Sequence, residues 1–142
     1  MIDYILLTLN VPASIKVVEQ VNNSSVFLVD SAKMQRVFTN LMKNAVDAMP
    51  KGGTLEITSR QSGGDFSVTF SDTGVGIASD TINKLFTPLF TTKAQGMGFG
   101  LSISKRIVEA HGGSINVVSA VGKGTSFTIT VSSKSERAHN NR

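Results

Sequence analysis

Two glycine-rich boxes in the middle of the chain constrain its structure more than any other feature. The first box, Asp72–Ile77, reads D-T-G-V-G-I, and the second, Gly96–Leu101, reads G-M-G-F-G-L. Alternating glycines leave the backbone uncovered, so that its N–H groups can approach a phosphate closely. The second box runs directly into an apolar-periodic segment, Leu101–His111, and a helix starting there would present unpaired N–H groups to an anion. A single such box is typical of a flexible turn, so the phosphate interpretation depends on the rest of the sequence.

The composition excludes several classes of site. The chain of 142 residues holds 14 Lys+Arg against 10 Asp+Glu, no cysteine and two histidines. Without cysteine there is no disulfide or thiolate chemistry, and two isolated histidines make a zinc site improbable. The basic residues are scattered and not interleaved with aromatic residues, which argues against nucleic-acid binding. The apolar run Met1–Val11 is too short to cross a bilayer, and Asp3 stands where a signal peptide carries positive charge, so we expect no membrane contact.

A long helix is predicted over Lys33–Met49, where apolar residues recur at spacings of three and four and form a single stripe. Asn40 and Asn44 lie four residues apart and therefore on one face of this helix. Asparagine lowers helix propensity, so two stacked asparagines require a reason. A solvated polar edge is one interpretation. Beside the glycine boxes, two amide oxygens that ligate a hard cation such as Mg²⁺ are the better one.

Alternation of apolar and polar residues predicts several strands, and short glycine-rich turns join four of them into two antiparallel hairpins. One strand ends at Asp72, whose carboxylate either caps the following loop or accepts a hydrogen bond from a ligand amine. A short helix is predicted from Ser79, as N-cap, to Leu85. His111 is expected to cap the helix that precedes Gly112-Gly113. The predicted strands are Ile15–Val21, Thr54–Arg60, Phe66–Phe70, Ser114–Ser119 and Ser126–Val131.

These elements fit one domain over residues 14–132. Residues 1–13 are interpreted as a linker or N-terminal strand, with the end of a linker helix as the other interpretation. Residues 133–142 are a charged tail with too little apolar content to pack, and we expect them to be disordered. The short link from Lys93 to Gly96 has few apolar anchors and is predicted to be a mobile lid.

The ordered set of motifs resembles the catalytic, ATP-binding domain of sensor histidine kinases, within the superfamily that includes DNA gyrase, heat-shock chaperones and mismatch-repair ATPases. The motifs are the asparagine helix, D-T-G-V-G-I, the Phe-rich segment Leu85–Lys93, G-M-G-F-G-L, H-G-G and G-K-G-T-S-F, spread over residues 14–132. The resemblance implies an α+β fold: a two-layer α/β sandwich of the Bergerat type, with a mixed, mostly antiparallel sheet packed against three helices.

The resemblance also implies roles for individual residues, with ATP and Mg²⁺ as the bound groups. Asn40 and Asn44 would be catalytic and metal-binding, with Asn44 the firmest Mg²⁺ ligand, and Asp72 would accept the adenine amine. Thr125 would reach the adenine through water. Lys93 is implied as a further catalytic residue in contact with phosphate. The remaining nucleotide-binding residues implied are Gly74, Gly76 and Ile77 around the base, Gly96, Gly98, Gly100 and the Leu101 N–H along the phosphates, and Lys43.

The chain departs from the family pattern in two places. Many members carry a basic residue three positions after the second asparagine, where this chain has Asp47; Lys43 precedes Asn44 but points about 100° away from it on a helix. The Phe-rich segment has Thr87 and Leu89 where a Glu or Gln and a Phe are common. The lid is short, as in the nitrogen-regulation and oxygen-sensing branch of the family.

Position 40 separates the reaction classes of the superfamily. Gyrase-like ATPases and serine-directed kinases place a glutamate there, because water and hydroxyl nucleophiles must lose a proton to a base. Neutral imidazole needs no such base, so Asn40 favours a histidine acceptor. A non-catalytic ATP-binding scaffold and a serine-directed kinase or ATPase remain the alternatives. We expect a cytoplasmic location, a monomer in isolation, and as partners a response regulator and histidine-bearing dimerisation helices outside this chain.

Overall fold

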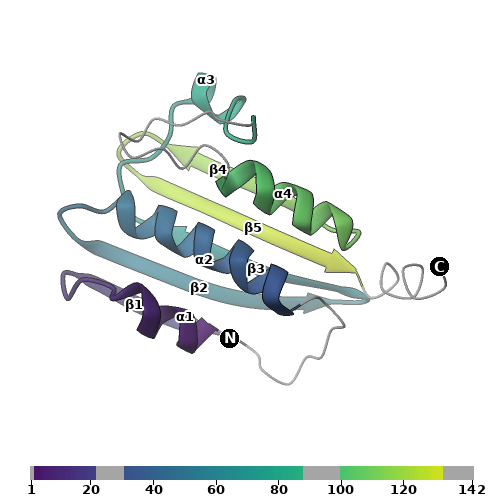
Figure 1. Ribbon diagram of the computed structural model, residues 1–142. Helices are drawn as coiled ribbons and strands as arrows, with labels where there is room; N and C mark the ends of the chain where they lie inside the picture. The colour runs from purple at the N-terminus through teal and green to yellow at the C-terminus, as the bar shows by residue number, and fades with distance from the viewer. Residues whose placement is uncertain (1, 22–30, 88–99, 133–142) are drawn as a thin grey trace.

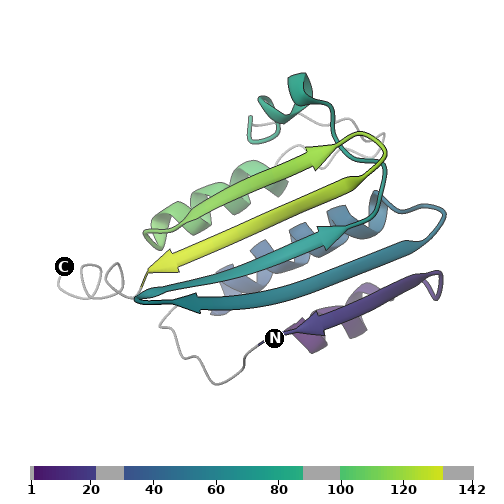
Figure 2. The same cartoon turned by 180° about the vertical axis from the view of Figure 1, so that it is seen from behind.

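The fold is an open five-stranded sheet with helices on one face, as seen in a computed structural model that describes residues 2–21, 31–87 and 100–132. Figure 1 shows α2 and α4 lying over one face of the sheet, roughly along the strands, and Figure 2 shows the opposite face of the strands without a helix over it among the described residues. The elements in chain order are α1 (Ile2–Leu9), β1 (Ile15–Gln20), α2 (Ser31–Asp47), β2 (Gly53–Ser62), β3 (Asp65–Asp72), α3 (Ser79–Ile82), α4 (Gly100–Ala110), β4 (Ser114–Ala120) and β5 (Gly124–Ser132).

The sheet is mixed and mostly antiparallel, which confirms the expected fold class. The strand order is β1-β2-β3-β5-β4, with β1 parallel to β2 and all other neighbours antiparallel. Both predicted hairpins form, β2 with β3 and β4 with β5. Because β3 and β5 are neighbours, Asp72 at the end of β3 is paired with Thr125 at the start of β5.

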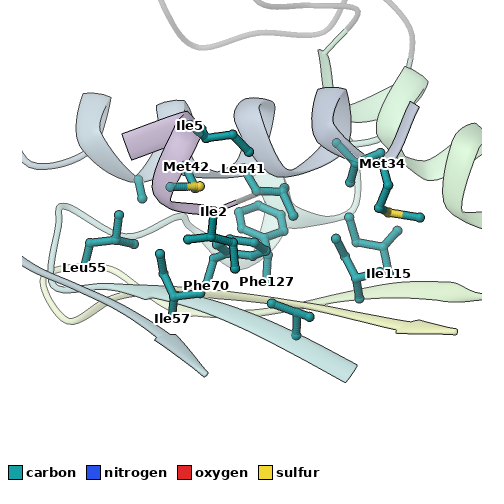
Figure 3. Packing of buried hydrophobic residues seen from close by; sticks show 14 of the residues in the cluster. Ile2, Ile5, Met34, Leu41, Met42, Leu55, Ile57, Phe70, Ile115 and Phe127 are labelled. Atoms are coloured by element: carbon teal, nitrogen blue, oxygen red, sulfur yellow. The ribbon is translucent and has the colours of Figure 1, made fainter. Parts of the chain in front are cut away.

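The core lies between the sheet and the apolar stripe of α2 (Figure 3). Leu41 and Met42 on α2 are fully buried, as are Leu55 and Ile57 on β2. The rings of Phe38 and Phe70 meet with centroids 5.3 Å apart and planes at 58°, a favourable tilted arrangement. Burial of each such side chain stabilises the fold by ~1.5–3 kcal/mol, so α2 is held firmly against the sheet.

Residues 2–9 form a helix, which contradicts the interpretation as a strand and agrees with the alternative interpretation as a helix. Helix α1 buries Ile2 and Ile5, three residues apart, within the main core cluster, whereas Tyr4 and Leu7 remain exposed. The helix stops before Asn10, whose φ of 52° is the left-handed conformation that asparagine tolerates better than most residues. The apolar run has no clear periodicity, so the sequence did not decide between helix and strand. Contact of this segment with α2 decides in favour of the helix.

The short helix after the first glycine box also differs from the prediction. Helix α3 ends at Ile82 and not at Leu85, which is buried in the turn that follows. Its N-cap is Ala78, which makes no side-chain capping bond, so Ser79 is the first helical residue. Ala78 has an extended backbone with ψ 150°, so the helix starts at Ser79. This is one residue earlier than the capping preference of serine predicted.

Helix α4 ends as predicted, with His111 and two glycines. The N–H of Gly113 donates to Val108 O at 3.0 Å and that of Gly112 to Glu109 O at 2.9 Å, which together form a Schellman motif. Gly112 has the positive φ of 74° that this motif requires. The Nδ1 atom of His111 lies 2.8 Å from Ile107 O, so the ring caps a carbonyl of its own last turn. None of the helices in the described part of the chain is long and apolar enough to cross a membrane.

Candidate functional site

The carboxylate of Asp72 is held in a fixed orientation at the end of β3. Its side chain is 8% exposed, and its Oδ1 atom accepts hydrogen bonds from the backbone N–H groups of Gly74 at 2.9 Å and Thr125 at 3.2 Å. The sequence predicted the position of Asp72 at a strand end. The pairing with Thr125 comes from strand register across 53 residues of chain. Bonds from two backbone donors orient a carboxylate toward a ligand at low entropic cost.

The first glycine box is clamped between the end of α2 and the end of β4. The N–H of Val75 donates to Ala48 O at 3.0 Å, and Val75 O accepts from Gly122 N at 2.8 Å. A Cβ atom on Gly74 would stand 2.3 Å from Ala48 O, and one on Gly76 would stand 2.0 Å from the Ala120 carbonyl oxygen. These glycines are therefore needed for close approach of backbone segments, and the box is a rigid wall beside Asp72.

Thr125 belongs to a hydrogen-bond network that the sequence analysis did not identify. Its side chain is 5% exposed, and its Oγ1 atom lies 2.7 Å from Ser119 Oγ on the neighbouring strand. Ser119 Oγ also accepts from Ile77 N at 2.8 Å and donates to Gly124 O at 2.9 Å. The alternation of its strand puts Ser119 on the same face as buried Ile115, but alternation alone does not distinguish it from other serines in strands. The structure brings Asp72, Gly76, Ile77 and Thr125 together as one group.

Asn40 connects α2 to the first turn of α4. Its Nδ2 atom donates to Gly100 O and to Ser104 Oγ, both at 3.2 Å, and Ser104 is itself fully buried. These bonds turn the amide oxygen of Asn40 away from the two acceptors. Asn44 lies one turn further along the same face of α2 and is half-buried, whereas Lys43 is exposed. Asn40 and the start of α4 at Gly100 thus meet at one junction, and Asn44 follows one turn along α2.

The donor chemistry at this junction suits a hard cation. Amide oxygens are ligands that Mg²⁺ accepts, usually together with water and phosphate oxygens. Within the described ranges, no group of three His, Asp or Glu side chains could hold a metal ion by itself. The asparagine oxygens are thus the candidate protein ligands for a cation among the described residues at this junction.

Three of the predicted phosphate contacts, Lys93, Gly96 and Gly98, lie outside the described residues, as does the predicted lid. The segment leading to them is anchored at its start. The ammonium group of Lys105 on α4 lies 5.3 Å from the centroid of the Phe86 ring, a cation–π contact, and Leu85 is buried in the core. Leu85 and Phe86, which follow α3, are thereby fixed against the core and α4.

Comparison with known proteins identifies the family. Residues 29–135 match the family described as histidine kinase-, DNA gyrase B- and HSP90-like ATPases. The chain belongs to this family. The match includes both asparagines, Asp72, both glycine boxes and Thr125, so the residues of the candidate site lie within the family's own domain.

Similar proteins place this ATPase-family domain among the histidine kinases. The sensor histidine kinase ZraS of Escherichia coli is 43% identical over 100 residues, 70% of this chain and 22% of ZraS. Sporulation kinase E of Bacillus subtilis is 40% identical over 100 residues, 70% of this chain and 14% of that kinase. The chain thus spans about a fifth or less of the length of these relatives.

Solved structures of histidine kinase catalytic domains share the fold. The catalytic domain of the histidine kinase ThkA superposes with a TM-score of 0.82 at 28% identity, covering 93% of this chain and 90% of that one. The mycobacterial sensor histidine kinase MprB gives a TM-score of 0.80 at 27% identity, covering 92% of this chain and 91% of the other. The sheet and its helical layer are therefore those of a histidine kinase catalytic domain.

Proposed function

We propose that this chain is the ATP-binding catalytic domain of a sensor histidine kinase and that it transfers the γ-phosphate of ATP to a histidine on a separate helical dimerisation domain. The observation that carries the proposal is the buried carboxylate of Asp72, oriented by Gly74 N and Thr125 N beside the rigid glycine box. Family membership and the similarity to ZraS support the reaction. A cytoplasmic location and a downstream response regulator belong to the same proposal.

Asp72 is proposed to select adenine. An ionised carboxylate only accepts hydrogen bonds, so it favours the adenine amine and disfavours the guanine 6-oxo group. Asp72→Asn should weaken ATP binding by ~1–3 kcal/mol, the range for leaving a buried polar partner unpaired. Isothermal titration calorimetry with ATP and GTP measures this, and Asp65→Asn, an exposed carboxylate at the other end of β3, is the matched control. Equal affinity of the parent chain for ATP and GTP would contradict the assignment.

Asn44 is proposed to be the residue whose amide oxygen would hold a Mg²⁺ ion when ATP is bound. The ion would neutralise phosphate charge during transfer, while Asn40 would hold the start of α4, where phosphates meet unpaired N–H groups. Asn44→Ala should abolish the Mg²⁺-dependent part of ATP affinity and leave the thermal unfolding midpoint nearly unchanged. Asn116→Ala, an exposed asparagine on β4, is the control. If Asn44→Ala binds Mg·ATP as tightly as the parent chain, Asn44 is not a ligand.

The acceptor histidine is proposed to lie outside this chain. His111 is at the far end of α4 from Gly100, and its Nδ1 atom is engaged by Ile107 O, so it is not positioned for in-line transfer. Asn40 stands where a base would activate water or a hydroxyl, so hydrolysis should be slow.

Radiolabelled ATP, with and without the native helical domain supplied in trans, tests the transfer. Acid-labile label should appear only on the added helices. Label on His111 or His139 of the isolated chain would overturn the proposed acceptor. Nucleotide binding without any transfer to the helices would instead indicate an ATP-binding scaffold.

A further inference from the structure

Ser119 is the centre of the hydrogen-bond network beside Asp72. Its hydroxyl lies 2.8 Å from Ile77 N, 2.9 Å from Gly124 O and 2.7 Å from Thr125 Oγ1. Ile77 belongs to the first glycine box, and Gly124 and Thr125 are the first two residues of β5. Ser119 can therefore influence a bound ligand through these neighbours without contacting it.

The donors and acceptors around Ser119 decide how the Thr125 hydroxyl points. A serine hydroxyl has one proton to donate and two lone pairs to accept with. The carbonyl of Gly124 only accepts, and the N–H of Ile77 only donates. All three contacts are hydrogen bonds at once when Ser119 donates to Gly124 O and accepts from both Ile77 N and Thr125 Oγ1. The Thr125 proton is then directed at Ser119, and Thr125 presents only lone pairs to a ligand.

A site in which Thr125 only accepts matches the carboxylate of Asp72, which also only accepts. Asp72 and Thr125 are paired across β3 and β5, so the two side-chain acceptors lie next to each other. Two adjacent hydrogen-bond acceptors favour a purine with a 6-amino group, which donates. They disfavour a 6-oxo purine, whose oxygen would need a donor.

We propose that Ser119 is a positioning residue that makes the site selective for 6-aminopurines by holding the Thr125 hydroxyl as an acceptor. The inference rests on the proposed ATP-binding function and deepens it, because it assigns part of the base selectivity to a residue that need not touch the base. Loss of the Ser119 hydroxyl frees the Thr125 proton to rotate and to donate toward a 6-oxo group, either directly or through a bridging water.

The test compares affinities for ATP and inosine triphosphate, which differ at the purine edge read by Asp72 and Thr125. In Ser119→Ala, the preference for ATP should fall by about three- to tenfold, the effect of about one hydrogen bond. In the Thr125→Val background the same serine substitution should no longer change the preference, because there is no hydroxyl left to position. Calorimetric titration of the four chains with both magnesium nucleotides gives the ratios.

A second hydroxyl pair provides the matched control. Ser71 Oγ and Ser126 Oγ lie 2.7 Å apart, one residue before Asp72 and one after Thr125, on the opposite face of the sheet. Ser126→Ala removes a cross-strand hydroxyl bond of the same kind and should leave the ATP preference unchanged. Ser119→Cys, with a weaker donor and acceptor of similar size, should lower the preference in the same direction and serves if the alanine variant does not fold.

Each outcome decides the inference. A reduced preference that disappears in the Thr125→Val background supports it. An unchanged ratio in Ser119→Ala, or an equal reduction in both backgrounds, overturns it and leaves Ser119 a purely structural residue. If the parent chain binds no ATP, the proposed function fails and the inference fails with it, whereas ATP binding with an unchanged ratio overturns the inference alone.

Discussion

The substitution Gly76→Ala should destabilise the domain for two separable reasons. Gly76 has a φ of 75°, a left-handed conformation that costs an alanine about 1–2 kcal/mol. The new Cβ would also stand 2.0 Å from the carbonyl oxygen of Ala120, about 1.4 Å short of ordinary contact, and the obstacle is backbone at the end of β4. Forcing such a shift costs about 1–3 kcal/mol. We therefore expect a loss of about 2–5 kcal/mol, a large part of the stability of a domain of this size.

Two other glycines separate these contributions. Gly122 has a φ of 80°, and a Cβ there meets nothing within 4 Å, so Gly122→Ala should lose only the backbone part, about 1–2 kcal/mol. Gly74 lacks the positive φ, but a Cβ would stand 2.3 Å from Ala48 O, so Gly74→Ala should lose mainly the steric part. Urea unfolding followed by circular dichroism gives the three free energies of unfolding. Equal losses for Gly76→Ala and Gly122→Ala would refute the claim that the first box is packed against β4.

Two further perturbations test other parts of the structure. Asn40→Ala should lower stability by about 1–2 kcal/mol and speed hydrogen exchange in the first turn of α4, because both bonds to that turn are lost, while Asn116→Ala should do neither. Desolvation raises the pKa of Glu19 most. A side-chain hydrogen bond with Asp3 and the repulsion between the two carboxylates raise it further. The folded state therefore binds this proton more tightly, and the associated stability is present below the unfolded pKa and lost as pH rises through the folded one. Glu19→Gln should stabilise the fold at neutral pH by a few tenths of a kcal/mol, about the size of an exposed charge interaction, and should change nothing near pH 4. Equal urea midpoints of parent and Glu19→Gln at neutral pH would contradict this.

The helix α2 and the two hairpins could be predicted from sequence because their signals are local. The stripe of α2 repeats with the helical period, and glycine-rich turns join strands whose alternation is clear. Reliance on local signals also explains why the segment of α1 was interpreted as a strand. Its apolar run contains Ile2 and Ile5 on a buried face but also Tyr4 and Leu7 on an exposed one, so periodicity did not decide between strand and helix.

The candidate site residues were also proposed from the chain alone, since the motifs occur in a fixed order. The contacts that each of these residues makes could not be predicted from the chain. Asn40 donates to Gly100 O across 60 residues, and Asp72 accepts from Thr125 across 53, and such pairs exist only once the helices and strands are assembled. Ser119 was missed for this reason: a serine in an alternating strand has no distinguishing local pattern.

Local sequence patterns were enough to predict α2, α4 and the strands, and to name candidate nucleotide-binding residues. The tertiary structure decided what the glycines of the first box are for. In the sequence they read as backbone left open to a phosphate, whereas Gly74 and Gly76 are packed against the carbonyls of Ala48 and Ala120. A glycine pattern records only that a side chain is absent, and the neighbour that requires its absence comes from distant parts of the chain.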